Sequence, residues 1–119
     1  MSEHLEQKAL IQWANLNLKI YPELSLLFAI GNSGHRSPIT GARLKEEGVR
    51  AGVPDLCLPV ARGPYGSLFI EMKRRMGGIV SPQQRKWIKA LREAGNKVEV
   101  CAGFIAARDE IIEYLEGAK

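Results

Sequence analysis

Three ionisable side chains in and beside two short apolar segments have the types and spacing of a metal-dependent site. Glu71 and Lys73 are separated by one residue in segment 68–73, and alternate side chains on a strand share a face. Asp55 stands directly before a second apolar segment, 56–60, and a Gly- and Pro-rich stretch lies between the two segments. This pattern predicts a hairpin that brings the Asp55 carboxylate beside that of Glu71.

Two carboxylates placed side by side repel each other unless a cation lies between them. Hard oxygen ligands of this kind suit Mg²⁺ or Mn²⁺. We therefore predict a divalent-metal site with the Lys73 ammonium next to it. The bare spacing is not specific, because an exposed Glu–Lys pair and a turn Asp after Pro54 would give the same pattern without chemistry.

Further motifs surround these residues in a fixed order. They are Gly48-Val49-Arg50-Ala51-Gly52-Val53-Pro54-Asp55, Leu68-Phe69-Ile70-Glu71-Met72-Lys73-Arg74, Ser81-Pro82-Gln83-Gln84 and Trp87. In order and spacing they resemble the VRR-NUC family of the PD-(D/E)XK nuclease superfamily. The resemblance runs from about Glu3 to Leu115 and implies a restriction-endonuclease-like fold and cleavage of DNA.

The reaction that this resemblance implies is metal-dependent hydrolysis of a phosphodiester. Asp55 and Glu71, with the backbone carbonyl of Met72 or Cys57, would hold one or two Mg²⁺ or Mn²⁺ ions that lower the pKa of a bound water. Lys73 would orient or deprotonate that water and stabilise the developing negative charge.

Two more site residues are implied by the resemblance. Family members carry a Glu in the first helix that joins the metal site; Glu3 matches it best, and Glu6, one turn deeper, is a rival. Either acid would also favour a helix N-terminus electrostatically. Gln84 stands three residues after Ser81 in a capping box, which suffices to explain it. The resemblance nevertheless implies that Gln84 faces the active site and is catalytic.

Positive charge is concentrated around this site. The chain carries a net charge of +4, but residues 32–92 contain twelve Lys or Arg against four Asp or Glu, a local net charge of +8. Such a distribution is expected if the substrate is a phosphate backbone, although a solvated basic surface would look the same. The candidate DNA contacts are Asn32, His35, Arg36, Arg43, Arg50, Arg74 and Arg75.

The predicted fold class is α/β, a restriction-endonuclease-like mixed β-sheet flanked by helices in the order α-β-α-β-β-α-β-α. Periodicity and capping signals place these elements at 3–18, 24–30, 41–47, 56–60, 68–73, from Pro82 to before Gly95, at 97–102, and in a final helix through Leu115. Ser2 is expected to cap the first helix and Thr40 the second, and segment 24–30 is expected to be a central strand. One side of the first helix carries Glu3, Gln7, Ile11, Ala14 and Leu18. We expect one VRR-NUC-like domain over 1–119.

Composition indicates an ordinary globular protein, with 45% hydrophobic and 25% charged residues. No apolar run approaches the roughly 20 residues of a membrane span, and no signal peptide is visible, so we expect the cytoplasm, here of a bacterial host cell. Cys57 and Cys101 have no metal-ligand spacing and are expected to be reduced core residues.

The resemblance is to stand-alone members of phage or mobile-element type, which implies a role in replication, recombination or repair. Such relatives are associated with branched DNA, so we expect a homodimeric Holliday-junction resolvase. Its dimer contact would use exposed apolar residues, with Ile39, Leu44, Tyr65 and Ile79 as candidates. The alternatives are a monomeric flap or nicking nuclease and a non-catalytic nucleic-acid-binding module.

Overall fold

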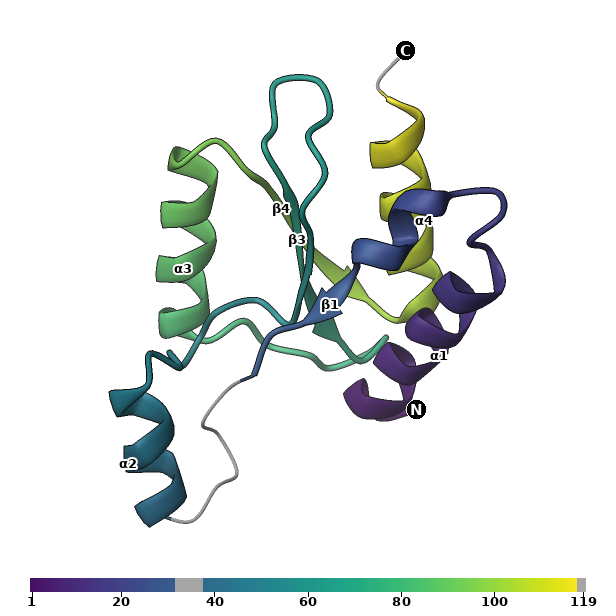
Figure 1. Cartoon of the computed structure of the whole chain (residues 1–119). Helices are drawn as coiled ribbons and strands as arrows, with labels where there is room; N and C mark the ends of the chain where they lie inside the picture. The colour runs from purple at the N-terminus through teal and green to yellow at the C-terminus, as the bar shows by residue number, and fades with distance from the viewer. Residues whose placement is uncertain (32–37, 118–119) are drawn as a thin grey trace.

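The computed structural model describes residues 1–31 and 38–117, and in it a four-stranded mixed sheet is covered by helices on both faces (Figure 1). The strands are β1 (Phe28–Ala29), β2 (Leu56–Leu58), β3 (Leu68–Lys73) and β4 (Lys97–Ala102), in the spatial order β1-β2-β3-β4. The β1–β2 and β2–β3 pairs are antiparallel and the β3–β4 pair is parallel. The predicted mixed sheet and element order are therefore confirmed.

The helices are α1 (Glu3–Leu16), the 3₁₀-helix η1 (Pro22–Leu26), α2 (Pro38–Glu46), α3 (Pro82–Glu93) and α4 (Phe104–Glu116). In Figure 1, α3 lies on one side of the sheet and α1 and α4 on the other, while α2 projects away from the body. The main apolar core lies between the sheet and the α1–α4 pair, where Leu10, Ile70, Met72 and Ile111 are fully enclosed. None of the described helices is long and apolar enough to cross a membrane.

Local sequence signals set several of these boundaries. The Ser2 hydroxyl accepts a hydrogen bond from Leu5 N–H and caps α1. Ser81 and Gln84 form the expected capping box at the start of α3, with Pro82 at the first helical position. At the other end of α3, Gly95 has a φ of 97°, which ends the helix as expected. Both cysteines are free and buried, and burial raises the pKa of the Cys101 thiol to about 12.

The prediction of a central strand over residues 24–30 is wrong. Pro22 starts a 3₁₀ turn instead, in which Leu24 N–H donates to the Tyr21 carbonyl and the Leu24 side chain enters the core. Only Phe28 and Ala29 form a strand, at the edge of the sheet, and Phe28 is 48% exposed. An apolar run without alternation indicates local hydrophobicity but does not decide between a buried strand and a helical turn.

Two helices also differ from their predicted form. The buried residues of α1 are Glu6, Leu10 and Ala14. Of the predicted side only Ala14 is among them, Glu3 is exposed, and Leu18 lies beyond the helix, which ends at Leu16. α2 begins at Pro38 and not after a Thr40 cap, because proline is suited to a first helical position.

Candidate nuclease active site

Asp55 and Glu71 are brought together by the register of the β2–β3 hairpin. Leu56 pairs with Ile70 in this antiparallel ladder, so continuing the register by one residue places Asp55 opposite Glu71 on the same face. The Asp55 carboxylate accepts a hydrogen bond from Met72 N–H at 2.7 Å, and its backbone carbonyl accepts one from Ile30 N–H at 2.7 Å. Asp55 is therefore fixed between the strands on either side of β2.

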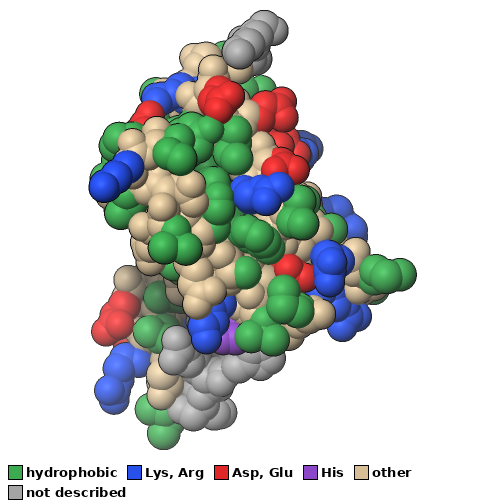
Figure 2. All heavy atoms as spheres, turned by 90° about the vertical axis from the view of Figure 1, so that its right-hand side faces the viewer, with side chains coloured by type: hydrophobic (Ala, Val, Ile, Leu, Met, Phe, Trp, Pro, Cys, Tyr) green, Lys and Arg blue, Asp and Glu red, His purple; other side chains and the backbone are tan. Residues whose placement is uncertain are grey.

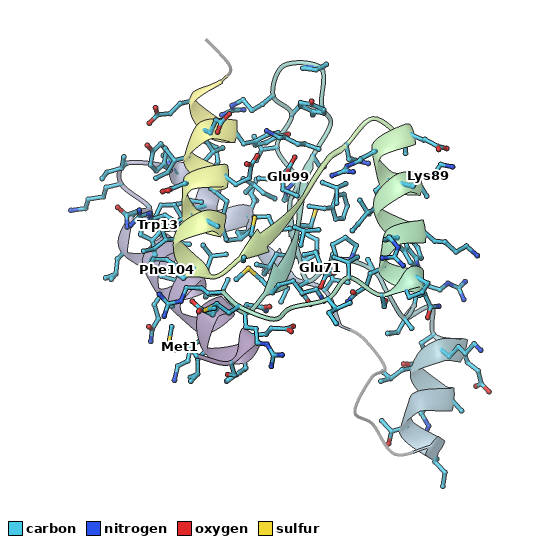
Figure 3. The ribbon with its side chains drawn as sticks, turned by 180° about the vertical axis from the view of Figure 1, so that it is seen from behind. Met1, Trp13, Glu71, Lys89, Glu99 and Phe104 are labelled. Atoms are coloured by element: carbon cyan, nitrogen blue, oxygen red, sulfur yellow. The ribbon has the colours of Figure 1, made fainter. Side chains whose placement is uncertain are left out.

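Alternation along β3 separates the core from the site. Ile70 and Met72 point into the apolar core, whereas Glu71 and Lys73 project toward the α3 side of the sheet. Figure 3 shows Glu71 on that side, facing the first turns of α3. Both charged side chains are nearly enclosed, since Glu71 is only 2% exposed and Lys73 only 7%.

Gln84 connects the two charged residues of β3. Its side-chain oxygen accepts from Ser81 N–H at 2.9 Å, as the capping box requires, and from the Lys73 Nζ at 3.1 Å. Its side-chain nitrogen donates to Glu71 Oε2 at 3.3 Å, and Lys73 Nζ lies 3.6 Å from the same oxygen. The structural and the site-facing interpretations of Gln84 are therefore compatible, because one amide serves both.

Gly52 allows the segment before Asp55 to approach α3 closely. Its φ is +91°, and a Cβ atom at this position would lie 2.8 Å from Gln83 Cγ and 3.0 Å from the Gln83 backbone. Any other residue would push this segment away from the start of α3. The Gly-Val-Pro-Asp motif thus places Asp55 against the helix that carries Gln84.

The electrostatics of this cluster favour a bound cation. Burial, together with the nearby Asp55 carboxylate, raises the pKa of Glu71 to about 8, and Lys73 only partly counteracts this. Glu71 Oε1 is buried and has no hydrogen-bond partner among the described residues. A divalent cation between Asp55 and Glu71 would satisfy that oxygen and remove the repulsion, so the residues fit such an ion.

Glu3 and Glu6 occupy different environments. Glu3 is exposed in the first turn of α1, and its role as a metal ligand stays a prediction. Glu6 is buried: its Oε1 accepts from Phe104 N–H at 2.9 Å at the start of α4, and its Oε2 lies 3.4 Å from Arg75 Nε. Figure 3 shows Phe104 on the α1 side of the sheet, away from Glu71. Within residues 1–31 and 38–117, no group of three or more His, Cys, Asp or Glu side chains could hold a metal ion.

The predicted DNA contacts that can be placed are exposed. Arg43 lies on α2, Arg50 follows it, and Arg74 and Arg75 follow Lys73 directly. Figure 2 shows Lys and Arg side chains gathered at the right-hand edge of one face, while acidic side chains collect near its top, toward the C-terminal end. Three candidates lie outside the described residues: Asn32, His35 and Arg36.

Comparison with known proteins decides the family. A model of the VRR-NUC domain matches residues 2–104. The chain belongs to the VRR-NUC domain family. A solved structure of a "VRR_NUC domain protein" is similar over 98% of this chain and 89% of its own, with 29% identity and a TM-score of 0.80. A search of curated proteins finds no match. Membership of this family implies a nuclease of the PD-(D/E)XK type that acts on DNA.

The sequence did not reveal the role of Glu6 as a cap for α4. A signal for it exists, because Gly103 at the N-cap position provides no side-chain acceptor for the first amides of that helix. The first amides of α4 therefore bond to acceptors from other elements or to water, and Glu6 supplies one such acceptor for Phe104.

Proposed function

We propose that this VRR-NUC domain, taken as a single domain over residues 1–119, is a Mg²⁺- or Mn²⁺-dependent structure-specific DNA endonuclease. The observation that carries the proposal is the buried Glu71 carboxylate, which faces Asp55 and leaves Oε1 without a hydrogen-bond partner in the described part of the chain. Glu71 is buried and Asp55 is half-buried, and two carboxylates that face each other in this setting are costly to ionise together unless a cation binds between them.

Each residue of the cluster has a role in phosphodiester hydrolysis. Asp55 and Glu71 would hold the divalent ion, together with the Met72 backbone carbonyl and waters. The ion, when bound, supplies Lewis-acid stabilisation of the phosphoryl oxygen and lowers the pKa of a coordinated water. Lys73 places a cation beside Glu71 at 3.6 Å, where it can orient the attacking water or stabilise developing negative charge. Gln84 keeps the Lys73 side chain directed at this position.

The proposed substrate is branched DNA, and the proposed enzyme is a homodimeric resolvase of four-way junctions acting in phage or mobile-element replication, recombination or repair. Paired cuts in a junction need two active sites related by a two-fold axis, and one chain provides one site. Of the candidate contact residues, Ile39 and Ile79 are strongly exposed and Tyr65 is less so.

The test is a panel of linear duplex, single-stranded, flap and four-way-junction DNAs of equal length, each incubated with Mg²⁺, Mn²⁺ or EDTA. We expect paired nicks in the junction with either ion and none in EDTA. Binding without cleavage under all conditions would leave only a nucleic-acid-binding module. Light scattering on the free and junction-bound protein addresses assembly, since a monomeric mass in both states would favour a monomeric nickase.

A further inference from the structure

The loop between β3 and α3 exposes apolar side chains a few residues after Lys73 of the candidate active site. Residues 74–80 follow Lys73 directly, and within them Met76 is 85% exposed and Ile79 is 80% exposed. Isolated surface hydrophobics are ordinary. Two that are almost fully exposed within four residues, next to a buried lysine of the site, are less easily explained by chance. We call Met76 and Ile79 the apolar tip.

The loop that carries the apolar tip is held at several points. Arg74 Nη2 donates to the Gly77 carbonyl at 3.2 Å, and Arg85 Nη1 from α3 donates to the Val80 carbonyl at 3.0 Å. A Cβ atom at Gly78 would lie 2.9 Å from Lys73 Cβ, so the backbone of the loop packs directly on that side chain. The outward position of the apolar tip therefore belongs to a fixed loop, and the same loop encloses the Lys73 stem.

The surroundings of the apolar tip are basic. Arg74 and Arg75 precede Met76 directly. A surface hollow of about 730 Å³ is lined by Met1, Arg74, Arg75 and Met76. Arg75 is held in place by Glu6, with 3.4 Å between Nε and Oε2, yet its side chain remains 65% exposed. An apolar projection bordered by guanidinium groups complements nucleic acid, in which phosphates surround apolar base faces.

We propose that Met76 and Ile79 form a wedge that contacts unstacked bases at the branch point of the DNA substrate. Apolar side chains inserted between bases must displace their stacking, which costs a few kcal/mol per step in continuous duplex. At a branch point part of that stacking is already absent, so the wedge favours branched over linear DNA. This inference rests on the proposed nuclease function and deepens it, because it names the part of the site that selects DNA structure.

The test compares a double variant, Met76→Ser with Ile79→Ser, against the wild type. Binding of a four-way junction and of a linear duplex of equal length is measured by fluorescence anisotropy in EDTA. Loss of two buried apolar contacts should reduce the preference for the junction on the order of tenfold. A 2-aminopurine base at the branch point should brighten with the wild type and not with the double variant. A second variant, Met76→Leu with Ile79→Leu, should restore both signals because it keeps the tip apolar.

A matched control carries Leu16→Ser and Ile20→Ser and should keep the junction preference. Leu16, the last residue of α1, is 85% exposed, and Ile20, which follows the helix, is 67% exposed. A retained preference in the Met76→Ser/Ile79→Ser variant, or an unchanged 2-aminopurine signal with the wild type, would overturn the wedge. A lower mass for the Met76→Ser/Ile79→Ser variant than for the wild type on light scattering would also overturn the wedge, because the apolar tip would then be a contact with a second copy of the chain. Metal-dependent cleavage by the wild type tests the nuclease function separately, and it can persist when the wedge fails.

Discussion

Magnesium binding at the Asp55–Glu71 pair should depend steeply on pH. The pKa of Glu71 is raised to about 8 in the metal-free protein by burial and by Asp55. A metal ion needs the ionised carboxylate, so below this pKa its binding must release a proton. A group with a pKa of about 8 is roughly 1% ionised at pH 6 and half ionised at pH 8, so the apparent affinity should rise about 50-fold between them and little above pH 9.

Isothermal titration calorimetry with Mg²⁺ measures this effect directly. Runs in two buffers of different ionisation enthalpy should show about one proton released per ion at pH 6.5 and almost none at pH 9. The Glu71→Gln variant should bind the ion more weakly and lose the pH step. Glu93→Gln is the matched control, because Glu93 is exposed on α3 and pairs only with Lys89 at 4.0 Å among the described residues. An Mg²⁺ affinity of the wild type that does not change with pH would refute the assignment of Glu71 as the titrating ligand. So would a pH-dependent rise in affinity that persists in the Glu71→Gln variant.

The same shift has a consequence for the stability of the metal-free protein. Because the folded-state pKa of Glu71 lies above its ordinary value of 4.5, the protonated form is favoured by folding. The stabilisation of the folded state by protonated Glu71 is complete below about pH 4.5 and is lost as the pH rises through about 8. The contribution of Glu71 should therefore lower the melting temperature in EDTA between pH 6 and pH 9, and saturating Mg²⁺ should remove most of that decrease. Glu71→Gln should show a smaller decrease in EDTA.

The remaining predictions concern catalysis and DNA binding. Lys73→Ala should abolish cleavage while leaving DNA binding by gel shift largely intact, and Asp55→Asn should remove both cleavage and Mg²⁺ binding in calorimetry; wild-type rates in either would rule out the site. Ser81→Ala and Gln84→Ala should each lower stability by about 1 kcal/mol through the lost cap. Only Gln84→Ala should also slow single-turnover cleavage, by about 10- to 100-fold, because it releases Lys73 and Glu71. Arg50→Ala should flatten the log–log salt dependence of DNA affinity by up to about 0.9; an unchanged slope would remove Arg50 from the phosphate contacts.

The parts of the fold that the sequence predicted well are those fixed by local chemistry. The β2–β3 hairpin follows from two apolar segments and a turn, and its register then places Asp55 opposite Glu71. The start of α3 follows from Ser81 and Pro82. The region from Pro22 to Ile30 could not be predicted in this way, because its apolar side chains divide between core and surface according to contacts made by distant elements.

The double role of Gln84 shows where local patterns stop being sufficient. The capping box accounts for its hydrogen bond to Ser81 N–H and predicts nothing about Lys73 or Glu71. Those contacts depend on the docking of α3 against β3, which Gly52 permits by its close approach to Gln83. Only the family resemblance indicated that this residue faces the site.

The choice between Glu3 and Glu6 was open for a physical reason. Both acids suit the first turn of a helix, and because they are three residues apart they occupy neighbouring positions on it, so periodicity does not state which of them is buried. Burial of Glu6 is explained by its two partners, Phe104 N–H and Arg75, and a buried carboxylate engaged in this way is costly to redirect toward a metal ion. Glu3 is exposed and has no such commitment among the described contacts, so any first-helix ligand for the Asp55–Glu71 site is better sought at Glu3. Calorimetry on Glu3→Gln should then show weaker Mg²⁺ binding at unchanged stability, and unaltered binding would leave the ion to Asp55, Glu71, backbone carbonyl and water.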